Sequence, residues 1–180
     1  MTPDPTPSQT VGPFFHDALL GEDRSELVPP DHPRAVRIEG TVYDGAAEPV
    51  PDAMVEIWQA NEAGRYSDPT DGPETFSGFG RSGTDADGRF SFVTVKPGPV
   101  PDGSLQAPHI MVSLFARGLL KRLVTRIYFP DEAESNAWDP VLSSIEDPEF
   151  RKTLVARQEG GVLRFDVHLQ GDNQTAFFEL

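Results

Sequence analysis

The sequence APHIMVSLFARG, residues 107–118, is the segment on which the prediction of the fold rests. Apolar residues alternate along it behind a lead rich in proline and glycine, as in a strand that enters a sheet. Because side chains alternate between the two faces of a strand, His109 and Met111 are predicted to share one face, and Ile110 and Val112 the other. A His-x-His pair at this place would begin a metal site. This chain has His-x-Met instead, and a soft thioether cannot replace imidazole toward a hard cation.

Several other short segments show the same alternation and are separated by turns. The chain contains 18 prolines and 16 glycines, many of which lie between these segments. Residues 61–83 are predicted to form a long loop, and residues 131–136 and 148–156 to form one or two short helices. About seven strands joined by turns predict an all-β chain folded as a β-sandwich. Besides the segment above, the predicted strands are residues 35–43, 53–59, 90–94, 123–129 and 163–169, with residues 175–178 returning from the last as a hairpin.

The length of the chain and its N-terminal composition predict one domain preceded by an arm. A chain of 180 residues is long enough to enclose a sizeable core in a single domain. Repeated prolines in residues 1–15 disfavour a helix, so this segment is predicted to be extended. We assign residues 1–34 to an arm and loop that pack on this chain and on a partner, and residues 35–180 to the sandwich.

Charge and composition exclude several classes of function. The formal net charge is −14, which excludes nucleic acid as a partner because its phosphates would be repelled. The absence of cysteine excludes disulfides, thiolate zinc sites and cysteine nucleophiles, and it agrees with a reducing compartment. The N-terminus lacks the basic and apolar regions of a signal peptide, and no apolar run approaches the roughly 20 residues of a membrane span. We therefore expect a cytoplasmic protein without membrane association.

Six motifs along the chain resemble the intradiol ring-cleavage dioxygenases and occur in the same order. They cover nearly the whole chain. The resemblance implies a β-sandwich on which two tyrosines and two histidines bind a non-haem ferric ion. It also implies cleavage of an aromatic diol between its hydroxyls by dioxygen. The motifs are PDAMVEIWQAN (51–61), GRY (64–66), GFGR (78–81), TVKPG (94–98), PHI (108–110) and TRIYF (125–129).

Carried over position by position, the resemblance retains half of the ligand set. Tyr66 matches the first tyrosine and His109 the first histidine. The second tyrosine is replaced by Val100 and the second histidine by Met111, while Gln106 stands where an arginine is expected. These four ligand positions are therefore predicted to be vestigial, with no metal and no catalytic residue in this chain alone.

Within the family, the chain is most similar to the α subunits of heteromeric members, which carry no iron. The segment TPSQTVGP, residues 6–13, contributes to this likeness. The resemblance implies a large α/β hetero-oligomer in which the β subunit holds the ferric ion and cleaves 3,4-dihydroxybenzoate. It further implies that Thr10, Gly12, Pro13 and Arg117 line the substrate pocket of the β subunit. Arg117 would supply a permanent positive charge for the substrate carboxylate.

Two alternatives remain open at this point. The first is a self-sufficient iron dioxygenase in which Tyr66 and His109 are joined by an unrecognised ligand. The second is a transthyretin-like or carbohydrate-binding sandwich without any relation to oxygenases, in which Arg117 is a strand-end arginine paired with a carboxylate. Val100 and Met111 argue against the first, and the ordered motifs argue against the second.

Overall fold

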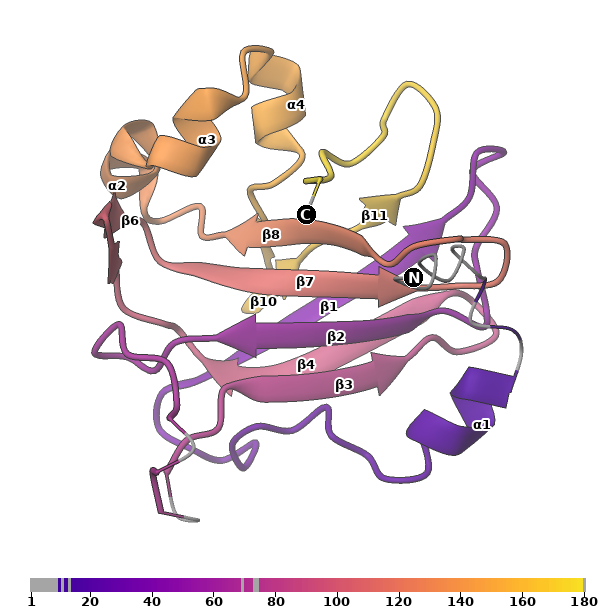
Figure 1. Ribbon diagram of the computed structural model, residues 1–180, viewed down its shortest axis with the longest axis horizontal. Coiled ribbons are helices and arrows are strands. Elements are labelled where there is room, and N and C mark those ends of the chain that lie inside the picture. The colour runs from indigo at the N-terminus through magenta and orange to yellow at the C-terminus, as the bar shows by residue number, and fades with distance from the viewer. Residues whose placement is uncertain (1–9, 11, 13, 69, 73–74, 180) are drawn as a thin grey trace, which may run out of the picture.

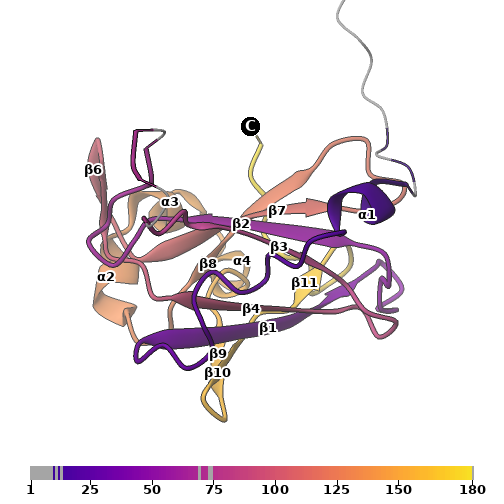
Figure 2. The ribbon, with the colours of Figure 1, turned by 90° about the horizontal axis from the view of Figure 1, so that it is seen from below.

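The computed structural model describes residues 10, 12, 14–68, 70–72 and 75–179, and two sheets face each other across one core (Figures 1 and 2). The first sheet is antiparallel and has the strand order β3-β2-β7-β8. The predicted β-sandwich is thereby confirmed. The strands of this sheet are β2 (Met54–Gln59), β3 (Phe79–Gly83), β7 (His109–Phe115) and β8 (Leu123–Tyr128).

The second sheet is mixed and is built around β1 (Ala35–Tyr43). Strand β1 pairs antiparallel with β4 and parallel with β10 and β11, while β9 pairs with β10. A separate two-stranded hairpin, β5 (Val100–Asp102) and β6 (Ser104–Gln106), immediately precedes β7. The remaining strands are β4 (Arg89–Val95), β9 (Arg157–Glu159), β10 (Val162–Arg164) and β11 (Val167–His168).

The core lies between the two sheets and follows the predicted alternation. On β7, Ile110 and Val112 are almost completely buried and belong to the main apolar cluster, whereas Met111 on the other face is only half-buried. Ile38 and Phe92 come from the second sheet and pack in the same cluster. Full burial of a large apolar side chain contributes about 1.5–3 kcal/mol to stability, so these alternating positions fix which face of each strand is turned inward.

Residues 24–27 cross the edge of the sandwich and join both sheets. Arg24 forms a bridge with Arg81 of β3, and the backbone nitrogen of Leu27 donates to the carbonyl of Val93 in β4 over 2.8 Å. Since β3 and β4 are edge strands, this segment satisfies backbone groups that would otherwise be open to pairing.

Two predictions about strands are wrong, the second of them only in part. Strand β3 lies inside the predicted loop 61–83, because pairing with β2 and with residues 24–27 stabilises a segment that is poor in apolar residues. The predicted C-terminal hairpin is present only in part: the backbone nitrogen of Thr175 donates to the carbonyl of His168 over 3.0 Å, but the predicted strand 163–169 is divided into β10, which forms its hairpin with β9, and β11, which pairs with β1. Phe178 instead bridges to Val124 of β8, so the last residues reach the first sheet.

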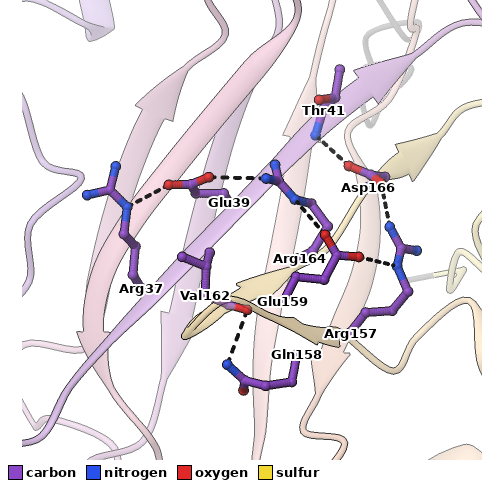
Figure 3. Close-up of polar contacts among 9 residues, drawn as sticks. All are labelled: Arg37, Glu39, Thr41, Arg157, Gln158, Glu159, Val162, Arg164 and Asp166. Carbon is purple, nitrogen blue, oxygen red and sulfur yellow. Dashed lines mark hydrogen bonds and ion pairs between the residues drawn. The ribbon is translucent and has the colours of Figure 1, made fainter.

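A network of charged residues attaches the C-terminal strands to β1 (Figure 3). Arg164 donates to Glu39 over 3.3 Å, and Arg157 donates to Asp166 over 2.8 Å (Figure 3). Asp166 also accepts from the backbone nitrogen of Thr41 over 3.0 Å. These contacts join β1 to residues more than a hundred positions away, which local sequence patterns do not reveal.

The described residues contain four short helices rather than one or two. Helix α1 begins at Phe14, within the segment predicted to be extended, and α3 was not predicted. Proline occupies the first turn of α3 and α4, where its missing N–H costs little. Helices α2–α4 gather at the end of the sandwich where β7 begins (Figure 1), and none of the described helices is long and apolar enough to cross a membrane. The helices are α1 (Phe14–Leu19), α2 (Ala133–Trp138), α3 (Pro140–Ser144) and α4 (Pro148–Lys152).

Candidate functional site

The two retained ligand positions lie in contact at the beginning of β7. The Tyr66 hydroxyl is 3.4 Å from Nε2 of His109, which is the first residue of β7 and is 1% exposed. Nδ1 of His109 lies 2.8 Å from the carbonyl oxygen of Ala107, which can only accept. The proton of the neutral imidazole is therefore on Nδ1, and Nε2 accepts from the Tyr66 hydroxyl.

Burial keeps this pair neutral. It lowers the pKa of the His109 imidazole, and the nearby Arg126 guanidinium lowers this pKa further. Burial also raises the pKa of the Tyr66 hydroxyl, an effect that Arg126 partly offsets. The pair consequently presents a phenol and an imidazole at neutral pH, rather than a tyrosinate.

The other two ligand positions provide no suitable donor. Val100 begins β5, is 5% exposed and can only offer hydrocarbon. Met111 shares its strand face with His109 and offers a thioether, which suits soft metals rather than ferric iron. In the described part of the chain, no group of three or more His, Cys, Asp and Glu side chains is placed to hold a metal ion.

Arg126 lies among these four positions, although no role could be predicted for it from the sequence. The register of β7 and β8 places it directly opposite Met111, whose sulfur accepts from Nε over 3.2 Å. Its Nη1 donates to Gln106 Oε1 over 2.8 Å and to the Tyr128 hydroxyl over 3.2 Å. Gln106 is the cross-strand partner of Val100, so this one guanidinium links both altered positions. Strand alternation in residues 123–129 was the available signal, but it required the register.

A buried aspartate supports the site from behind. Asp139 is fully buried, and its Oδ2 accepts from the backbone nitrogen of Ala107 over 2.8 Å. Its Oδ1 accepts from the Tyr128 hydroxyl over 3.0 Å and from the backbone nitrogens of Val141 and Leu142, both over 2.9 Å. Asp139 therefore caps α3 and also fixes the entry into β7.

One aromatic side chain beside the pair lies at the surface. Trp58 of β2 stacks on the Tyr66 ring, with centroids 5.9 Å apart and planes inclined by 10°. It is 38% exposed, so it covers Tyr66 without belonging to the core.

Arg117 lies away from this pair. It lies two residues after Phe115, the last residue of β7, whereas His109 is the first residue of that strand. Its guanidinium forms an ion pair with Asp52, and its side chain remains 64% exposed. The structure therefore does not bring Arg117 together with the vestigial ligand positions.

A groove of about 1180 Å³ opens beside Arg117. Arg117, Lys121 and Arg122 contribute three positive charges to its lining and Asp44 and Glu179 two negative ones, which leaves one positive charge in excess in a chain whose formal net charge is −14. Leu119 and Phe177 provide apolar surface in the same groove. This combination suits an anionic group attached to an apolar body.

The N-terminal positions are described only in part. Thr10 is exposed, and Gly12 is half-buried with a φ of +71°, a conformation that favours glycine. Pro13 lies outside the described residues. Their predicted part in a partner's pocket stays a prediction.

Comparison with known proteins places the chain in a family. A family model described as Dioxygenase matches residues 11–171. The chain belongs to the intradiol dioxygenase family. The alternative of a binding sandwich without relation to oxygenases is therefore wrong.

Curated relatives in this intradiol dioxygenase family match the chain over nearly its whole length. The protocatechuate 3,4-dioxygenase alpha chain of Pseudomonas putida is 42% identical over 97% of this chain and 96% of that chain. The corresponding alpha chain of Burkholderia cepacia is 43% identical, with 97% of each chain covered. The beta chain of the Burkholderia cepacia enzyme is 37% identical over 93% of this chain and 77% of its own length.

Solved structures agree with the sandwich. The dioxygenase domain of a fusion protein from Streptomyces sp. SirexAA-E has a TM-score of 0.59 and 28% identity, with 96% of this chain and 100% of that chain covered. Catechol 1,2-dioxygenase from Acinetobacter sp. ADP1 has a TM-score of 0.58 and 21% identity, with 84% of this chain and 65% of that chain covered. The second likeness concerns the fold alone.

Membership of the intradiol dioxygenases implies non-haem iron, and the residues present here do not suit it. A hard ferric ion prefers anionic oxygen and imidazole ligands. At the four positions this chain offers one protonated phenol, one imidazole, one thioether and one hydrocarbon, with a guanidinium in their midst.

Proposed function

We propose that this chain is the α subunit of a protocatechuate 3,4-dioxygenase. It pairs with a β subunit that holds the ferric ion, in a large α/β hetero-oligomer. The complex opens the ring of 3,4-dihydroxybenzoate with dioxygen to give 3-carboxy-cis,cis-muconate, a reaction of aromatic catabolism by the β-ketoadipate pathway. Support comes from the greater identity to two alpha chains, 42% and 43%, than to a beta chain, 37%.

The observation that carries this proposal is the altered donor set. Tyr66 and His109 remain in contact, but Val100 and Met111 cannot complete a ferric site. A chain of this family with such a pocket requires a partner that supplies the iron. Its own contribution is then to bind and orient the substrate.

Arg117 is suited to that contribution. Its side chain is 64% exposed although Asp52, with which it forms an ion pair, is only 26% exposed. Because a guanidinium carries five N–H donors, its exposed part can bind a substrate carboxylate while the pair with Asp52 is kept. The groove beside it has one positive charge in excess and apolar side chains in its lining, and a benzoate likewise joins a carboxylate to an apolar ring.

The N-terminal arm is the second element that we assign to the partner's pocket. We propose that Thr10, Gly12 and Pro13 lie against the substrate in the β subunit. The exposed position of Thr10 and the glycine-type backbone of Gly12 are compatible with an arm that contacts another chain.

Co-expression tests the proposal. The chain, a β subunit with all four ligands, and both together are purified, and consumption of 3,4-dihydroxybenzoate and dioxygen is measured for each preparation. We expect a stable α/β complex with full ring-cleavage activity and an inactive lone chain. Turnover by the lone chain would instead support the self-sufficient dioxygenase, and failure of the two chains to associate would refute the proposed subunit role.

A further inference from the structure

Arg126 connects all the altered parts of the former ligand site. Its guanidinium donates to the sulfur of Met111 over 3.2 Å and to Oε1 of Gln106 over 2.8 Å, and Gln106 pairs with Val100 across the β5–β6 hairpin. On β8, Tyr128 accepts from Arg126 and lies directly opposite His109.

We propose that the guanidinium of Arg126 is a cation built into this chain, which takes the place of the metal and excludes a ferric ion. The chain would then be iron-free for two separate reasons, missing donors and a resident positive charge. This inference goes beyond the proposed function, because it concerns the chain's own pocket and holds whether or not a β subunit binds.

The position of this charge is held by its acceptors. Gln106 and Tyr128 both accept from Nη1, and Tyr128 itself donates to the buried Asp139 over 3.0 Å. The arginine guanidinium is a permanent cation in proteins. A ferric ion brought beside it would meet repulsion that deprotonation cannot relieve.

A purely structural role is the competing explanation. In that case Arg126 only ties β8 to the β5–β6 hairpin, and its charge is irrelevant to metal binding. The two explanations differ in what happens when the missing ligands are restored, because only a resident cation would still keep iron out.

The test uses the full-length chain with Val100→Tyr and Met111→His, which restore the donors. This double variant is compared with the same chain carrying in addition Arg126→Gln, which removes the charge but retains hydrogen-bonding groups, or Arg126→Lys, which retains the charge. Arg81→Gln in the same background is the matched control, because Arg81 is also a partly buried, paired arginine of the first sheet. Ferric affinity is measured by competition with citrate, together with the visible tyrosinate-to-iron absorption.

We expect Arg126→Gln to increase ferric affinity on the order of 10- to 100-fold, which is the range by which groups next to metal ligands change metal affinity. The same variant should show the visible tyrosinate-to-iron band. Arg126→Lys and Arg81→Gln should leave binding as weak as in the double variant. Equal binding with and without Arg126, equal effects of Gln and Lys at that position, or no binding in any variant would each overturn the proposal.

Circular dichroism and thermal unfolding verify that each variant is folded. If Val100→Tyr prevents folding, the Arg126 and Arg81 variants are compared in the Met111→His background instead. In that background the new histidine is a third donor beside His109 and Tyr66.

Discussion

Replacing Arg117 with alanine should weaken binding of one substrate selectively. In the proposed complex the guanidinium contacts the carboxylate of 3,4-dihydroxybenzoate, and a hydrogen bond to a charged group contributes about 1.5–3 kcal/mol. Each 1.4 kcal/mol corresponds to a factor of about ten, so KM should rise on the order of 10- to 100-fold. Catechol has no carboxylate, and its KM should change little. Because the substitution removes the ion-pair partner of Asp52, which is only 26% exposed, the free energy of unfolding should also fall by about 1–2 kcal/mol.

Steady-state kinetics of the α/β complex with both diols measure this effect. Arg89→Ala is the matched control, since Arg89 is also 64% exposed and paired with an aspartate, Asp87, but is not among the residues that line this groove. Its effect on KM should be small for both substrates. An equal rise in KM for 3,4-dihydroxybenzoate and catechol in Arg117→Ala, or a large loss of thermal stability, would show that Arg117 is a structural residue and does not contact the carboxylate.

Three further predictions concern the vestigial site and its support. Asp139→Ala leaves several buried donors without an acceptor and should lower the free energy of unfolding by about 3–5 kcal/mol. The control Asp147→Ala removes one hydrogen bond at the exposed start of α4 and should lower it by only about 0.5–1 kcal/mol. Urea denaturation measures both. Gly64→Ala should destabilise the chain by roughly 2 kcal/mol or more, because its φ is +74° and a Cβ would lie 1.9 Å from the Pro99 carbonyl oxygen; an unchanged unfolding midpoint would contradict this. Burial lowers the folded-state pKa of His109, so the unfolded chain binds the proton more readily and stability should fall as pH decreases below about 6.5. His109→Gln should remove that part of the pH dependence, as followed by urea denaturation at several pH values.

Much of the sandwich could be predicted because its strands alternate locally. The burial of Ile110 and Val112 on β7 follows directly from a two-residue period, and the bounds of β1 match the predicted segment. Strand β3 and the pairing of β9–β11 could not be predicted, since they depend on partners that are distant in sequence. Helix α3 owes its beginning to Asp139, whose other bonds reach β6–β7 and β8.

The candidate site could also be predicted only in part. Family motifs located Tyr66 and His109, and the structure places them in contact. Arg126 and Asp139 were missed because their roles arise from strand register and from burial, neither of which is visible in a local pattern. The predicted roles of Arg117 and the arm concern a second chain and depend on the complex.

We propose that this chain holds no ferric iron of its own and depends on a partner for it. The most direct measurement is the iron content and visible absorption of the chain purified alone, beside those of the α/β complex. We predict little iron and no tyrosinate-to-iron band for the lone chain, and both iron and the band for the complex. Stoichiometric ferric iron with a tyrosinate band in the lone chain would contradict the account.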